Sequence, residues 1–403
     1  MAADAQVPEP RGWFNLRQRL ETKDVDPQLS SPLYARIPPE IRDLIFELAV
    51  TEFASPKART IKSDAFVQES HDLMPIPESA GPSTVEESIS ERFRNQIQGI
   101  VRPRHHMRPY TREHSREPRD GFDWLRFDNT EPMKVGTTLL LTCRRAYLEA
   151  HSLPLLRTEQ RFYCHRGPYS GNSEGSRVDI GKFITNRLSN PAPVPGLYQK
   201  DLVRSVRLFT QQFWLEDTFL QFVNTSVWFA NLEHLRITLR RSDWWDWERN
   251  AVPRVNPFRG NCYHGHTVGL MHQDMEAETG NVEFREGAWG KAFSHMLKLK
   301  TLTIDFETSE DKRDDMETIV TWALRWRFPL ANGRHLSTGG QTASKMSWRG
   351  LPHHWSDKCV SCDKFVRNSP PGQDCPKCKE TRQLFSQRYG PQLLVWTCLW
   401  TPV

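Results

Sequence analysis

Three segments in the second half of the chain share one arrangement of apolar residues, and this constrains the fold more than any other feature. In each segment, apolar residues stand at the first, fourth and sixth positions. The segments are VRSVRL (203–208), LEHLRITL (232–239) and LKTLTIDF (299–306). Short apolar-rich runs of this kind, separated by stretches of different periodicity, predict buried or half-buried strands.

Stretches with the apolar spacing of a helix separate these segments. Their apolar stripes are Phe219, Leu220, Val223 and Val227, then Trp289, Phe293, Met296 and Leu297, and finally Met316, Ile319, Val320, Ala323 and Leu324. Strands that alternate with helices favour parallel βα units with right-handed crossovers. The run LLVWTCLW (393–400) predicts one more buried strand, in or near the same sheet. The predicted class is α/β, and α+β overall once the N-terminal helices are included.

The strand spacing is typical of a degenerate leucine-rich repeat. The first two segments begin at 203 and 232, an interval within the range of such repeats, whereas the third begins at 299, so an insertion must lie before it. Gln211, Arg240 and Glu307 stand where these repeats usually have asparagine. A regular horseshoe is therefore not expected.

Four cysteines near the C-terminus form the strongest chemical motif in the chain. They lie in two CxxC pairs, CVSC and CPKC, and are Cys359, Cys362, Cys375 and Cys378. Each pair can present two thiolates from a tight turn, and two pairs complete a tetrahedral site. We expect a structural Zn(II) site in a zinc ribbon at 355–382, because four protein ligands leave no open position for a substrate.

A second motif is the amphipathic helix expected after Pro38. Its apolar stripe is Ile41, Leu44, Ile45, Leu48 and Ala49. One such stripe cannot be buried alone. The expected packing partner is a second stripe within LLLTCRRAYLEA, formed by Leu139, Cys143, Ala146, Tyr147 and Ala150.

These segments carry a resemblance to a known family. IPPEIRDLIFELA, followed by LLLTCRRAYLEAHSLPLLRTEQRFYC, resembles the F-box-like module of a large family of uncharacterised fungal proteins, and SDWWDWE, RWRFPL and LLVWTCLW extend the likeness. The resemblance implies binding of a Skp1-type subunit of a ubiquitin ligase. The implied partner-binding residues are Ile37 and Pro38 at the opening turn, with Ile41, Leu44 and Ile45 behind them. The family's two helices are contiguous, whereas here about 80 residues separate them, a separation that loop-closure entropy tolerates.

Composition completes the expected domain organisation. Hydrophobic residues make up 37% of the chain and charged residues 26%, a low apolar share that favours partial disorder. We expect a mobile tail at 1–30 and an F-box-like module at 31–165, interrupted by a disordered insertion at 52–132. A repeat-like α/β domain is expected at 200–403, and it includes the zinc ribbon. The start of the chain lacks a secretory signal and no apolar run is long enough to span a membrane, so the expected location is cytoplasm or nucleus, with reduced cysteines.

Three weaker motifs favour ordinary structural roles. The arginine-rich stretch VRPRHHMRPYTREHSREPRD is diluted by acidic residues and is typical of a solvated linker rather than a nucleic-acid patch. The group Cys262, His264, His266 and His272 lacks a second ligand pair for a metal. The tryptophans of SDWWDWE (Trp244, Trp245 and Trp247) are expected to fold over the end of the sheet rather than form a binding platform.

Three common enzyme motifs, the Walker phosphate loop, HExxH and GxGxxG, are missing from the sequence. We therefore expect a non-enzymatic interaction protein. The first hypothesis is an F-box-like adaptor that presents an unknown substrate protein to a ubiquitin ligase. The alternatives are a zinc-stabilised interaction module without a ubiquitin role, and a nucleic-acid binder that uses the ribbon and the arginine-rich stretch.

Overall fold

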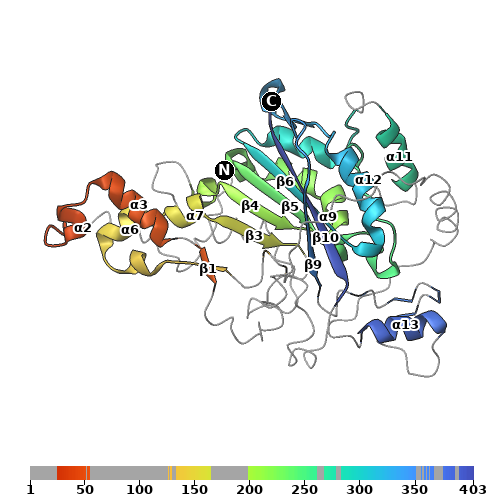
Figure 1. Cartoon of the computed structure of the whole chain (residues 1–403). Coiled ribbons are helices and arrows are strands. Elements are labelled where there is room, and N and C mark those ends of the chain that lie inside the picture. The colour runs from red at the N-terminus through yellow and green to blue at the C-terminus, as the bar shows by residue number, and fades with distance from the viewer. Residues whose placement is uncertain are drawn as a thin grey trace, which may run out of the picture. The chain divides into compact units, whose positions relative to one another are not determined.

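The computed structural model of the chain divides into two compact units, each described here by itself. The structure describes residues 25–50, 52–54, 126, 128, 133–164, 198–260, 267–277, 283–350 and 390–403, together with 355, 358–359, 361–362, 364–366 and 375–385 (Figure 1). The expected tail at 1–30 and the expected insertion at 52–132 fall mostly outside these residues. Within the described part of the chain, no helix is both long and apolar enough to cross a membrane.

The first unit is a small helical module that combines residues from before and after the long insertion. Its helices are α2 (Pro32–Ala35), α3 (Pro39–Ala49), η3 (Thr138–Leu141), α6 (Arg144–Ala150), α7 (Leu153–Arg157) and η4 (Gln199–Leu202). The two ends of the insertion are joined by an antiparallel pair, β1 (Glu52–Ala54) with β2 (Met133–Val135), in which Phe53 lies opposite Lys134. This pairing explains how α3 and α6 come together although their sequences are far apart.

The core of this unit lies between α2, α3 and α6. Tyr34, Phe46 and Ala150 form its buried centre. Partly buried side chains around them are Leu33, Leu139, Leu140, Cys143 and Leu153. Pro39 begins α3 after the extended residue Pro38, which suits a helix start because the missing amide donor would have no partner there.

The buried face of α3 differs from the expected one. The helix turns Arg42, Phe46 and Val50 inward, at an i, i+4, i+8 spacing, and all three are buried. Ile41, Leu44 and Leu48 are exposed instead. The expectation that the Ile41–Leu48 stripe packs against the second helix is therefore wrong. The physical reason is that Phe46 offers more apolar surface than any residue of that stripe, and the face that buries it lies on another side of α3.

The second unit is built on an eight-stranded mixed sheet in the order β3-β4-β5-β6-β10-β8-β7, with β9 also paired to β10. The strands are β3 (Glu159–Tyr163), β4 (Ser205–Phe209), β5 (His234–Leu239), β6 (Thr301–Ser309), β7 (Phe328–Pro329), β8 (His335–Ser337), β9 (Ser344–Arg349) and β10 (Gln392–Pro402). The three repeated segments are β4, β5 and β6. They lie side by side and parallel, with Val206 beside Leu235 and Leu235 beside Leu302, as predicted.

The strand β10 contains the predicted run at 393–400 and lies next to β6. It runs antiparallel, with Trp396 opposite Phe306. Strands β8 and β9 also pair with β10 in the antiparallel sense. The sheet is thus mixed, and its C-terminal part departs from the all-parallel sheet of a repeat protein.

Helices cover one face of this sheet. The covering helices are α9 (Gln212–Asp217), α10 (Phe219–Thr225), η5 (Val227–Asn231), η8 (Trp289–His295) and α12 (Arg313–Ala323) (Figure 1). Two further helices, α11 (Thr267–Glu276) and α13 (Pro376–Phe385), lie elsewhere in the unit. Strand residues such as Ile237, Ile304 and Phe306 are buried on the helical side. A cluster of aromatic rings fills the space above them, in which Trp326 lies 5.1 Å from Trp322 and 6.3 Å from Trp400, measured between ring centroids. The three predicted helical stripes lie mainly in α10, η8 and α12. Val227 belongs to η5 instead, and Met296, Leu297 and Leu324 lie just beyond the ends of η8 and α12.

Candidate functional site

The four predicted metal ligands lie together in the second unit. Cys359 and Cys362 occupy a tight turn that is closed by an isolated antiparallel bridge between Lys358 and Phe365. The amide of Cys359 donates a hydrogen bond of 2.9 Å to the carbonyl of Lys364. The second pair lies at the beginning of α13, with Cys375 just before the helix and Cys378 within it. The described part of this module is therefore one turn and one helix.

The sulfur positions fit a metal ion. All four Sγ atoms lie within 4.8 Å of one another. The separations are 3.5 Å for Cys359–Cys375, 3.3 Å for Cys362–Cys378 and 3.6 Å for Cys375–Cys378. A disulfide would need about 2.05 Å, whereas four sulfurs at about 2.3 Å from a tetrahedral ion lie roughly 3.8 Å apart. The four cysteines thus form a set of four sulfur donors that could hold one metal ion.

The predicted partner-binding residues lie on or beside α3. Exposed fractions of 48% for Ile41, 55% for Leu44 and 73% for Leu48 show that this apolar row faces solvent within its unit. Pro38 is exposed as well, whereas Ile37 and Ile45 are half-buried. The exposed row is defined here as the α3 surface (Ile41, Leu44 and Leu48). It comprises two of the five predicted residues and adds Leu48.

The other side of α3 is fixed by a buried arginine. Arg42 donates hydrogen bonds of 3.1 and 3.2 Å to the two carboxylate oxygens of Glu149 on α6, and one of 2.9 Å to the carbonyl of Ile37. Its guanidinium also lies 5.3 Å from the centre of the Tyr34 ring. The module is thus held together without using the α3 surface.

No family model, no curated protein and no solved structure matches the chain. The F-box-like resemblance therefore stays a prediction from sequence motifs.

The remaining predicted motifs divide into two groups. Trp244 is buried, donates its indole N–H to the carbonyl of Glu307 at 2.7 Å and stacks on Phe306, so it folds over the end of the sheet as expected. Trp245 and Trp247 are half-buried. The arginine-rich stretch and the Cys262–His266 segment lie outside the described residues.

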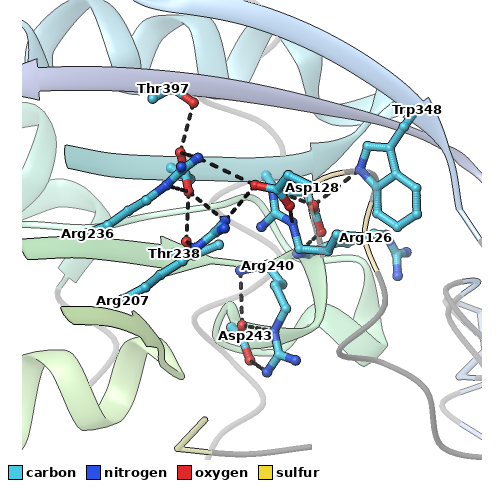
Figure 2. Close-up of polar contacts among 12 residues, drawn as sticks. Arg126, Asp128, Arg207, Arg236, Thr238, Arg240, Asp243, Trp348 and Thr397 are labelled. Atoms are coloured by element: carbon cyan, nitrogen blue, oxygen red, sulfur yellow. Dashed lines mark hydrogen bonds and ion pairs between the residues drawn. The ribbon is translucent and has the colours of Figure 1, made fainter. Parts of the chain in front are cut away.

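A network of buried charges on the second face of the sheet was missed by the sequence reasoning (Figure 2). Its centre is the fully buried carboxylate of Asp305 on β6. This group accepts hydrogen bonds from Thr238 at 2.7 Å, from Thr397 at 2.8 Å and from Arg236 at 2.8 and 3.0 Å. Arg207 adds a contact of 3.2 Å. Burial by itself would raise the pKa of Asp305, but the two arginines outweigh it and hold this pKa below its ordinary value.

Glu307, two residues further along β6, forms the second part of the network. Its carboxylate accepts a hydrogen bond of 3.1 Å from the amide of Arg241 and one of 3.3 Å from the indole of Trp348. Arg126 lies 3.4 Å away. Burial raises the pKa of Glu307, and the charge of Arg126 opposes that rise without cancelling it.

Two members of the network come from the span at 52–132, for which we expected disorder. Arg126 is almost fully buried, and its Nε donates to Asp128 at 3.1 Å. Asp128 accepts from Arg207 at 2.7 Å. These two residues depart from the expectation because each meets a buried opposite charge on the sheet, which hydropathy alone does not reveal.

A usable signal for part of this network does exist in the sequence. Arg207 and Arg236 occupy the same position, the fifth, in the first two repeated segments. Parallel pairing in register then brings them side by side. Asp305 and Asp128, the acidic partners, do not share a position in the repeated segments. Only the tertiary structure therefore brings them to the arginines.

Proposed function

We propose that this chain is a non-enzymatic adaptor, which binds a partner protein through the α3 surface. The observation that carries the proposal is the exposure of Ile41, Leu44 and Leu48 on one amphipathic helix. Apolar residues at this spacing lie on one side of a helix, and a contiguous apolar row that is left in water is typical of a docking surface.

The partner we propose is a Skp1-type subunit of a ubiquitin ligase. The F-box-like resemblance supports this choice, since it implies binding through the same helix. Packing of this stripe against the second helix, as expected from the sequence, would compete with partner binding. The structure supports the adaptor function because Phe46 and Arg42 fix the helix from another side, and the α3 surface stays available.

The second unit would then hold the substrate protein, with the cysteine site as a stabilising element. We propose that the ion is Zn(II), since four thiolates in a tetrahedral set are typical of structural zinc. The site would close the turn at Cys359 onto α13 and supply local folding energy rather than catalysis.

Direct binding of the purified full chain to a purified Skp1-type subunit tests the adaptor function. We expect a complex at micromolar concentration, and we expect Leu44→Asp to weaken it by about a hundredfold, as loss of a central apolar anchor does. Leu297→Asp is the matched control, because Leu297 is also 55% exposed but lies in the second unit. It should leave binding unchanged.

Other outcomes would reject the proposal. If the wild-type chain binds no such subunit, the zinc-stabilised interaction module without a ubiquitin role is favoured. If instead the chain binds nucleic acid with strong salt dependence, the third hypothesis is favoured. Equal loss of binding in the Leu44→Asp and Leu297→Asp variants would mean that the α3 surface is not the docking site.

A further inference from the structure

The second face of the sheet presents a small site built from two arginines and one carboxylate. Arg207 on β4 and Arg236 on β5 are register partners on parallel strands. Both guanidinium groups approach Asp305 on β6, Arg207 at 3.2 Å and Arg236 at 2.8 Å. Two cations and one anion leave a formal charge of +1. Because these groups are largely withdrawn from water, this uncompensated charge calls for one further anion.

Asp128 supplies that anion. Its Oδ2 lies 2.7 Å from Nη2 of Arg207 and 3.5 Å from Nη2 of Arg236 (Figure 2). Asp128 belongs to no strand of the sheet. Its carboxylate therefore binds the two arginines from outside the sheet, as the carboxylate of a separate ligand would. The side chain of Arg236 is 30% exposed and that of Asp128 is 20% exposed, so water reaches this part of the network.

The charge balance selects the kind of anion. One negative charge brings the three sheet residues to neutrality. A phosphate dianion would add a second charge next to the buried carboxylate of Asp305, and like charges at this separation repel strongly at low dielectric. A single carboxylate also matches the N–H donors of the guanidinium groups.

The basic residue two positions before Asp128 matters too. Arg126 lies 3.1 Å from Asp128 and 3.4 Å from Glu307. Its cation therefore lies between the bound carboxylate and the second acidic residue of the sheet. The pattern presented to the sheet is a basic residue, one spacer and an acidic residue.

We propose that Arg207 and Arg236 form a binding site for the carboxylate of an acidic peptide segment, and that Asp128 occupies this site in cis. A partner segment with the same basic-spacer-acidic sequence pattern competes with Arg126 and Asp128 for the sheet. The inference is independent of the α3 surface, which lies in the other unit.

The first arm of the test removes the internal carboxylate from the full chain and offers a small one. Asp128→Gly should lower the thermal midpoint, and sodium formate should restore much of the loss, because formate fits the space left beside Arg207. Sodium chloride and sodium phosphate at equal ionic strength should restore less. Adding Arg207→Gln to Asp128→Gly should abolish the formate effect. Stabilisation by formate that equals stabilisation by chloride overturns the proposal.

The second arm uses a labelled synthetic peptide that covers residues 122–132 of this chain. It should bind Asp128→Gly about tenfold more tightly than wild type, because the internal competitor is weakened. A peptide with asparagine at the position of Asp128 is the control and should not bind. If Asp128→Gly does not fold, Asp128→Asn replaces it, since the amide keeps the volume and removes the charge. Equal binding of both peptides, or of the acidic peptide to wild type and variant, contradicts the inference.

Discussion

Arg42 on α3 binds both carboxylate oxygens of Glu149 on α6, through hydrogen bonds of 3.1 and 3.2 Å that span 107 residues of sequence. The arginine is buried and the glutamate is partly exposed. Arg145, one turn before Glu149, contacts the same carboxylate at 3.0 Å. This pairing joins the two halves of the helical module across the long insertion.

Removal of the arginine should therefore loosen the module. We predict that Arg42→Ala costs about 2 kcal/mol of local stability, since it leaves the carbonyl of Ile37 and part of Glu149 without their donor. Amide hydrogen exchange in α3 and α6 should then accelerate roughly 30-fold. Arg36→Ala, a change at an exposed arginine just before α3, is the control and should leave exchange unchanged. Unaltered exchange in Arg42→Ala would mean that the pair is not needed for packing.

Truncation on the two sides of α3 should change stability by very different amounts. Phe46 is fully buried, so we predict that Phe46→Ala destabilises the module by about 3–5 kcal/mol through cavity formation. Leu44 is mostly in solvent, so Leu44→Ala should change stability by less than about 0.5 kcal/mol. Exchange of the α3 amides measures both effects. The reverse order would show that the stripe of Ile41 and Leu44 forms the core, as the sequence had suggested.

The cysteine site should hold one metal ion per chain. We predict about one equivalent of zinc by elemental analysis of protein purified without chelator. Cys378→Ser should lose the metal, whereas Cys398→Ser, a change at a buried cysteine on β10, should keep it. A chelator should accelerate amide exchange in α13 and leave β4 and β5 protected, because the metal stabilises its own module. A metal-free wild-type chain with a protected α13 would refute the prediction.

Glu216 should make stability fall as the pH rises. This carboxyl is buried on α9, and burial raises its pKa from the ordinary 4.5 to about 7, although Gln212 and Trp245 donate hydrogen bonds to it at 2.8 and 3.2 Å. The unfolded chain releases this proton near pH 4.5 and the folded chain only near pH 7. The contribution to stability is therefore complete below pH 4.5 and is lost as the pH rises through 7, by up to about 3 kcal/mol.

Comparison of the wild type with Glu216→Gln isolates the contribution of Glu216 to the pH dependence of stability. Urea unfolding at pH 5 and pH 8 should show a decline in wild type that the variant lacks, because the amide does not ionise. Carboxyls with lowered pKa, such as Asp305 and Asp274, are present in both proteins and cancel in the difference. Parallel pH profiles of wild type and variant would contradict the prediction.

The sequence by itself determined the three repeated strands, the helices between them and the grouping of the four cysteines. Apolar spacing predicted strands at 203–208, 232–239 and 299–306, with helices between them, because strand and helix periodicities depend only on neighbouring residues. The two CxxC pairs predicted the cysteine cluster, since short spacing brings two thiolates together in almost any tight turn. Parallel pairing followed from the alternation of strands with helices.

Only the tertiary structure decided which faces are buried and which charges meet. Periodicity shows that α3 has an apolar row, but the choice between Ile41 and Phe46 as the core side depends on the shape of α2 and α6. Charged residues that alternate with apolar ones on a strand predict a solvated face. Arg207 and Asp305 are nevertheless buried, and they pair with each other while Arg207 also pairs with Asp128. Such pairings join residues 79 and 98 positions apart, and they form because a buried charge is stable only beside its opposite.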